Sequence, residues 1–160
     1  SNLFNMAVSA RLALHGTTTL TGDCVMLAGS KSYFVAEQWD DILIERLAKK
    51  DIQLSAPLWG RGLPLAQAEA AECEAQALEA LTIDKEGLEQ AGLNQERRAL
   101  LLEPQHLQYQ VDEDTITLKF ALPSGSYATS LLRELFVYQD VQEVARQKML
   151  AEQRSAEAQQ

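Results

Sequence analysis

The side chains best suited to chemistry gather in one segment, PSGSYATSLLR, which runs from Pro123 to Arg133. The hydroxyls of Ser126 and Thr129 lie close to Gly125, and Arg133 follows Thr129 by one helical turn. A helix that begins here offers unpaired backbone N–H groups, and these groups with a nearby guanidinium favour an anion such as a phosphate or a carboxylate. A plainer alternative stays open, in which Ser126 only caps the helix and Arg133 is a solvated or salt-bridged surface residue.

Two alternating stretches come before this segment and must position it. Apolar side chains occupy every second position from 107 to 111 and from 116 to 122, and Asp112-Glu113-Asp114 separates the two runs. This pattern predicts an antiparallel β-hairpin with one buried face. Pro123 then ends the strand and Gly125 permits a sharp turn. A helix follows from Ser126, and its apolar face consists of Ala128, Leu131, Leu132, Leu135 and Phe136.

The first hundred residues mix helical and strand periodicities, which predicts an α/β arrangement. Helices are expected over residues 3–14, 39–50, 65–81 and 84–90, and strands over 24–28, 33–36 and 51–58. The segment WGRGLPL at 59–65 contains two glycines and a proline and predicts a loop. Residues 96–102 contain both basic and apolar side chains, and their pattern favours neither a helix nor a strand.

The charge of the chain argues against nucleic-acid binding by this chain alone. Its formal net charge is −9, whereas phosphate contacts need clustered lysines and arginines. The segment 65–96 holds eight acidic residues against the single Lys85, so the remainder is close to neutral. An acidic helical face can therefore coexist with a neutral or basic working surface elsewhere.

Other features of the sequence narrow the class of protein. No apolar run is long enough to span a bilayer, and SNLFNMAVSARLAL lacks the basic start of a secretory signal, so we expect a cytoplasmic protein without membrane contact. Cys24 and Cys73 form no CxxC pair; two buried reduced thiols are expected, with one disulfide as the alternative. His15 and His106 have no partners at ligand spacing, so no metal site is expected.

The segment around Gly125 resembles the C-terminal signature of the TruD family of tRNA pseudouridine synthases, F-x-L-P-x-G-S-[YF]-A-T-x-x-x-R-E-[LI]. The matching residues are Phe120, Leu122, Pro123, Gly125, Ser126, Tyr127, Ala128, Thr129, Arg133, Glu134 and Leu135. Further matches follow in order: Leu3-Phe4-Asn5, Gly22-Asp23 with Leu27 and Gly29, Phe34-Val35-Ala36, Trp59-Gly60, and Arg97-Arg98 with Leu101, Leu102 and Pro104. The resemblance covers about residues 1 to 137.

The resemblance implies an isomerase that converts a uridine in the D arm of tRNA, at position thirteen, to pseudouridine without cofactor or metal. Family members carry an essential aspartate in a segment that reads roughly G-x-K-D-x-x-A-x-T-x-Q, in their N-terminal half, which also holds a pocket-lining K-G-N-x-F segment. The only Lys-Asp pair here is Lys50-Asp51, and it lacks the surrounding glycine, alanine and threonine. The chain therefore resembles the second half of the enzyme. It is expected to contain no catalytic residue and to be inactive alone.

The resemblance also implies a division of the chain and a role for each part. Residues 1–103 correspond to most of an inserted α/β domain, residues 104–138 to the C-terminal hairpin and helix of the catalytic domain, and residues 139–160 to a helical or frayed polar tail. The expected fold class is α/β, with α+β character. The expected partners are tRNA and the N-terminal half of the same polypeptide, in a monomeric full-length protein. The alternatives are a non-catalytic RNA-binding or protein-interaction module of the same fold, and an acidic protein-binding domain with a coincidental motif.

The implied site residues fall into two groups. The first supports the active site: Gly125, Ser126, Tyr127, Thr129 and Arg133. The second contains candidates for RNA contact: Trp59, Arg61, Arg97, Arg98, Asn5 and Arg11. Each candidate has a structural alternative, namely a loop-anchoring tryptophan with a solvated Arg61, a salt bridge from Arg97-Arg98 to the acidic helix, and ordinary surface positions for Asn5 and Arg11.

Overall fold

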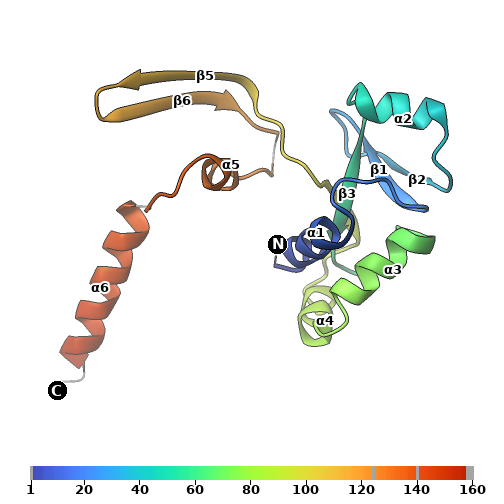
Figure 1. Cartoon of the computed structure of the whole chain (residues 1–160). Helices are drawn as coiled ribbons and strands as arrows, with labels where there is room; N and C mark the ends of the chain where they lie inside the picture. The colour runs from blue at the N-terminus through green and yellow to red at the C-terminus, as the bar shows by residue number, and fades with distance from the viewer. Residues whose placement is uncertain (1, 124, 140, 158–160) are drawn as a thin grey trace. The chain divides into compact units, whose positions relative to one another are not determined.

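The computed structural model of the chain describes residues 2–123, 125–139 and 141–157 (Figure 1). These residues divide into two compact units, Ser1–Leu102 and Glu103–Gln160. The first unit contains a mixed sheet-and-helix core, and the second contains a hairpin and two helices. The expected mixed α/β class is confirmed, and every strand pairing within the named sheets is antiparallel.

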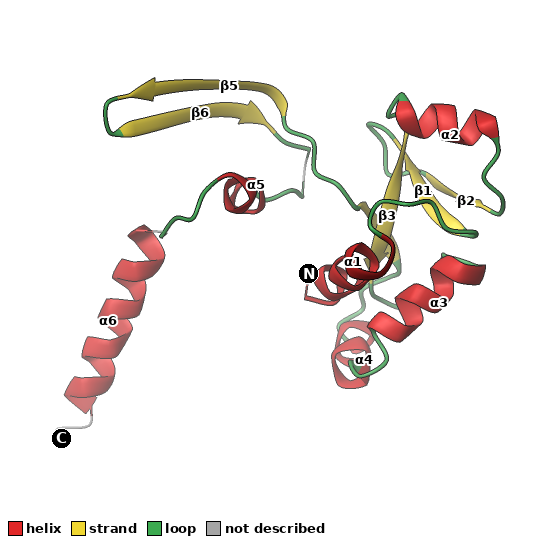
Figure 2. Ribbon diagram, in the orientation of Figure 1, coloured by secondary structure: helices red, strands yellow, loops and turns green. Residues whose placement is uncertain are grey.

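The first unit contains a four-stranded sheet in the order β2-β1-β3-β4, of which Figure 2 labels β1, β2 and β3. The strands are β1 (Asp23–Leu27), β2 (Tyr33–Ala36), β3 (Ile52–Leu58) and β4 (Glu96–Ala99). Val25 of β1 pairs with Leu54 of β3, and Pro57 of β3 pairs with Arg97 of β4. The three strands expected from the sequence are confirmed. The sequence did not predict β4, because ERRA has no apolar alternation and becomes a strand by pairing with β3.

Four helices accompany this sheet: α1 (Asn2–His15), α2 (Asp41–Ala48), α3 (Ala68–Ala77) and α4 (Thr82–Gln90). α1 and α2 pack apolar side chains on a cluster around Val25, Ile52 and Leu54. α3 packs on the strand β1 through Ala70 and Cys73. A third cluster, Leu3, Ala7 and Leu78, joins α1 to the residues between α3 and α4.

α3 is shorter than the helix that the sequence predicts over residues 65–81. Its start is set by the loop before β1, because the backbone N–H of Gln67 donates to the carbonyl of Gly22 at 2.9 Å and that of Ala70 to Thr21 at 3.1 Å. A Cβ on Gly22 would lie 2.1 Å from the carbonyl oxygen of Gln67, so this approach requires glycine. At the other end, the fully buried Leu78 turns the chain into the third cluster.

The second unit contains the predicted hairpin, with β5 (Gln105–Asp112) and β6 (Thr115–Ala121), followed by α5 (Ala128–Leu135) and α6 (Val141–Glu157). The expectation that one hairpin face is buried is wrong for this chain. Every residue of β5 is exposed, including Tyr109 at 76% and Val111 at 64%. The apolar alternation is present, but the described residues of this chain do not cover it. The tail is helical through Glu157, and residues 158–160 lie outside the described part.

Candidate functional site

The elbow between β6 and α5 has the geometry that the sequence predicts. Gly125 adopts a φ of +84°, a conformation that other residues adopt only with strain. A Cβ at this position would meet no atom within 4 Å, so the backbone conformation and not space requires the glycine. The N–H of Ser126 donates to the carbonyl of Pro123 at 3.1 Å and closes the turn.

The helix begins later than expected. α5 starts at Ala128, and its N-cap is Tyr127 in an extended conformation with no side-chain capping bond. The predicted start at Ser126 is therefore wrong, and so is the alternative in which Ser126 caps the helix, because this residue belongs to the turn that precedes the cap. The first turn of α5 presents backbone N–H groups that no side chain of the cap residue satisfies, an arrangement that favours an anion.

Two of the five predicted support residues line one groove of the second unit. Thr129 and Arg133 of α5 lie along an open groove of about 750 Å³, together with side chains of the α5–α6 connector and of α6. Arg133 and Thr129 are exposed. The structure places Gly125, Ser126 and Tyr127 at the elbow before α5, with Ser126 half-buried and Tyr127 exposed.

The groove also contains residues that the sequence did not indicate. The connector contributes Phe136, Val137, Tyr138 and Gln139, and α6 contributes Val144 and Gln147. The helical periodicity after Tyr138 indicated a helix, but periodicity does not show which other element that helix lies against. Sequence reasoning therefore missed these six residues as parts of a groove.

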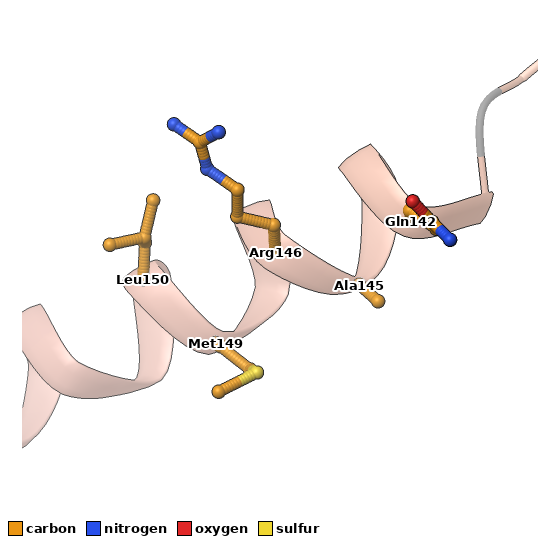
Figure 3. Close-up of a pocket in the computed structure, with 5 residues that line it drawn as sticks. All are labelled: Gln142, Ala145, Arg146, Met149 and Leu150. Atoms are coloured by element: carbon orange, nitrogen blue, oxygen red, sulfur yellow. The ribbon is translucent and has the colours of Figure 1, made fainter.

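A second hollow belongs to α6 alone and offers no enclosed site. Gln142, Ala145, Arg146, Met149 and Leu150 line it, and all five come from the same helix. Figure 3 shows their side chains along this one helix, with no second element drawn beside them. A ligand here would be held from one side only.

Arg97 is buried and belongs to a polar network inside the first unit. It is 7% exposed, and its two terminal nitrogens contact the Glu74 carboxylate at 2.6 and 3.0 Å. Its Nε donates to the hydroxyl of Ser55 at 2.9 Å, and the Ser55 hydroxyl donates to the carbonyl of Cys24. The structure thus shows the salt bridge to the acidic helix, which was the alternative to a phosphate contact.

Arg11 is also a structural residue. Arg11 is 4% exposed and Asp23 is 2% exposed, so neither the RNA contact proposed for Arg11 nor its alternative, an ordinary surface position, fits this buried side chain. The guanidinium donates to both carboxylate oxygens of Asp23, at 2.6 and 3.0 Å, and to the carbonyl of Thr18 at 2.9 Å. Asp23 also accepts from the N–H of Leu20 at 2.7 Å, so the buried carboxylate is well satisfied.

Trp59 anchors its loop instead of presenting a free ring. Its Nε1 donates to the Glu89 carboxylate at 2.9 Å, and the Nζ of Lys85 lies 5.0 Å from the ring centroid. The neighbouring Arg61 is exposed and donates through Nε to the carbonyl of Glu89 at 2.6 Å. The Gly60 Cα between them approaches Asn94 so closely that a Cβ would lie 2.4 Å from its backbone.

The remaining two candidates lie at the surface. Arg98 is half-buried, and its guanidinium carbon lies 5.1 Å from the ring centroid of Phe4. Asn5 of α1 is exposed, next to that ring in sequence. The first unit therefore leaves Asn5, Arg61 and Arg98 accessible to a ligand and withdraws Arg11 and Arg97 from it.

Neither cysteine forms a disulfide, and both thiols are buried, as the sequence indicated. Burial raises the pKa of Cys24 and of Cys73 above the ordinary value, so both remain protonated at neutral pH. Among the described residues, no group of three His, Cys, Asp or Glu side chains could hold a metal ion. None of the helices in the described part of the chain is long and apolar enough to cross a membrane.

Comparison with known protein families gives a match over most of the chain. Residues 1–135 match the family described as tRNA pseudouridine synthase D (TruD). A tRNA pseudouridine synthase D of Shewanella oneidensis is 61% identical over 150 residues, which cover 94% of this chain and 40% of that protein. A tRNA pseudouridine synthase D of Xanthomonas campestris is 46% identical over 152 residues, covering 92% of this chain and 41% of that protein.

A solved structure shares the fold. It is a crystal structure from Methanosarcina mazei described as a tRNA pseudouridine synthase D, with a TM-score of 0.62 and 24% sequence identity. The likeness covers 82% of this chain and 35% of that one. The chain thus spans about two-fifths of the length of the relatives it matches.

Proposed function

Because this chain belongs to the TruD family of tRNA pseudouridine synthases, we propose that it forms part of an isomerase that converts a uridine of tRNA to pseudouridine. The family match over residues 1–135 carries the proposal. The substrate position is uridine thirteen, in the D arm. The catalytic aspartate lies in another part of the polypeptide, so the 160-residue chain alone is inactive.

The reaction needs positioning more than it needs external reagents. The bond from C1′ of the ribose to N1 of uracil breaks, the base turns, and C1′ bonds to C5; the C5 proton leaves and N1 gains one. Atoms and charge balance without cofactor or metal. A target base within an RNA stem must first leave the stack, which calls for a cleft that holds both the base and its backbone.

The second unit supports the active site in this proposal. Gly125 sets the elbow, and Ser126 and Tyr127 lead into the start of α5, whose N–H groups favour an anion. Arg133 and Thr129 then present a guanidinium and a hydroxyl on one exposed face. Such donors suit a phosphate of the substrate strand.

The first unit supplies RNA contacts from its accessible candidates. Asn5, Arg61 and Arg98 are the side chains that remain at the surface, and Trp59 fixes the loop that carries Arg61. Arg11 and Arg97 serve the same unit from within, by holding β1 and β4 in place. We assign these two residues to folding and the three surface residues to RNA contact.

The exposed apolar face of the hairpin supports the proposal that further polypeptide is present in the active enzyme. Tyr109, Val111 and Ile116 alternate along paired strands and are half or more exposed. Such a row of large apolar residues is expected to be covered in a functional protein. We propose that the N-terminal part of the same polypeptide covers it, in a monomeric, cytoplasmic enzyme.

The proposal is tested with a tRNA transcript that carries tritium at C5 of its uridines, because isomerisation releases this label. The full-length polypeptide should release tritium, and reverse transcription after carbodiimide treatment should map the product to position thirteen. The 160-residue chain should release none. An inactive full-length polypeptide that still binds tRNA would favour a non-catalytic RNA-binding module instead.

Arg133 offers a sharper test of the assigned role. In the full-length polypeptide, Arg133→Ala should lower kcat/KM by roughly tenfold or more, because a charge-assisted bond to a phosphate contributes about 1.5–3 kcal/mol. Lys119→Ala removes another exposed cation of the second unit, outside the signature, and is the control that should keep its activity. Wild-type kinetics for Arg133→Ala at unchanged thermal stability would make Arg133 an ordinary surface residue.

A further inference from the structure

The groove between α5 and α6 is formed by three successive pieces of chain. α5 contributes Thr129 and Arg133, the connector contributes Phe136 and Gln139, and α6 contributes Val144 and Gln147. The connector turns back beside α5, because the Tyr138 hydroxyl donates to the carbonyl of Thr129 at 3.4 Å. The groove is therefore lined by α5, the connector and α6 together.

The chemistry of this groove is selective. Among the described residues, its polar lining consists of a guanidinium, two hydroxyls and two carboxamides, with no acidic side chain. This contrasts with the formal net charge of −9 for the whole chain. Arginine, threonine, tyrosine and glutamine are the side chains that contact phosphate and sugar oxygens of nucleic acids. Phe136 adds an aromatic ring of the kind on which ribose or an unstacked base can lie.

The family model ends at residue 135, whereas Gln139, Val144 and Gln147 come after it. The relatives from Shewanella oneidensis and Xanthomonas campestris align over 94% and 92% of this chain, so their likeness continues into α6. The family model itself assigns no role to this helix.

We propose that the α5–α6 groove binds the sugar–phosphate backbone of the tRNA, with Arg133 and Gln147 among the contacting side chains. This inference rests on the proposed function and names a contact surface for the same substrate. α6 extends the RNA-binding surface past the elbow and helix that serve the active site. Its contribution is to affinity, because it contacts the backbone of the substrate and not the base that reacts.

The test places a charge in the groove of the full-length polypeptide. Gln147→Glu should raise the Kd for an unmodified tRNA transcript roughly two- to fivefold at low salt, as expected for one exposed repulsive contact. It should raise KM by the same factor and leave kcat unchanged, because the lost interaction is common to ground and transition states. Gln147→Lys should instead lower the Kd and steepen its salt dependence by about one ion.

The same helix provides the control. Gln142→Glu makes the identical change on the flank of α6 that Figure 3 shows, outside the groove, and should leave Kd and KM at wild-type values. If Gln147→Glu binds tRNA as tightly as Gln142→Glu in an enzyme that forms pseudouridine, the groove proposal is wrong and the proposed function stands. If the unaltered full-length polypeptide forms no pseudouridine, the proposed function fails first. Equal thermal melts for both variants exclude a folding effect.

Discussion

The buried pair of Arg11 and Asp23 makes the strongest quantitative prediction for the first unit. Both side chains are almost fully buried, and Asp23 binds both terminal nitrogens of the guanidinium and the N–H of Leu20. Removing one partner leaves the other charge buried without compensation. Arg11→Met should therefore lower the free energy of unfolding by about 3–5 kcal/mol.

Replacing both partners separates the charge from the packing. The double variant Arg11→Met with Asp23→Leu removes both buried charges and should recover much of the loss, because well-packed apolar residues can replace a buried ion pair at little cost. The Lys49–Glu45 pair is the control: both side chains are more than half exposed, so Lys49→Met should change stability by less than about 1 kcal/mol.

The assay follows from the placement of the tryptophans. Trp39 and Trp59 are the two tryptophans of the chain, and both lie in the first unit. Tryptophan fluorescence during urea unfolding therefore reports on this unit alone. If the variants and the wild type have equal m-values, their urea midpoints can be compared directly as differences in stability. If Arg11→Met lowers the free energy of unfolding no more than Lys49→Met does, Arg11 and Asp23 do not behave as a buried charge pair and the explanation fails.

Three further predictions concern the same unit. Gly22→Ala should lower the free energy of unfolding by more than about 2 kcal/mol, because a positive φ and a backbone clash act together. Gly29→Ala has a positive φ but open space and should lower it by about 1 kcal/mol. The urea midpoints of the two variants test this difference. The raised pKa values of Cys24 and Cys73 mean that folding favours the neutral thiols, so their contribution to stability is retained below about pH 9 and falls as the pH rises. A variant with alanine at both positions should therefore lose less unfolding free energy between about pH 8 and 10 than the wild type. An equal loss in the two proteins would contradict this explanation. Arg97→Lys should cost about 1.5–3 kcal/mol, since an ammonium cannot reproduce the bidentate contact and the bond to serine, and a thermal melt at the wild-type temperature would refute this.

Much of the second unit followed from the sequence because its pattern is local. Period-two alternation predicted the hairpin, and Pro123 and Gly125 predicted the turn that the structure contains. Local pattern did not show whether a face is covered, since coverage depends on other polypeptide. The hairpin therefore has the predicted alternation and an exposed apolar face. The start of α5 was also misplaced, by two residues, because the amide of Ser126 closes the turn.

In the first unit, helix boundaries depended on tertiary contacts. The composition of residues 65–81 favours helix throughout, yet α3 spans only Ala68–Ala77. The loop at Thr21 and Gly22 accepts the first N–H groups, and the burial of Leu78 ends the helix. Intrinsic propensity is worth only tenths of a kcal/mol per residue, so such contacts override it.

The family and the conformation of the elbow could be predicted from local sequence, because a signature of eleven residues and a glycine at positive φ are local properties. Which arginines are available to a ligand depends instead on how distant elements pack. Arg97 and Arg98 are neighbours on β4, where successive side chains point to opposite faces. Glu74 of α3 receives Arg97 in the interior, and Arg98 stays half-exposed over Phe4. Arg97 and Arg98 are the same residue type, so their different roles come from the distant elements that pack on the two faces of β4.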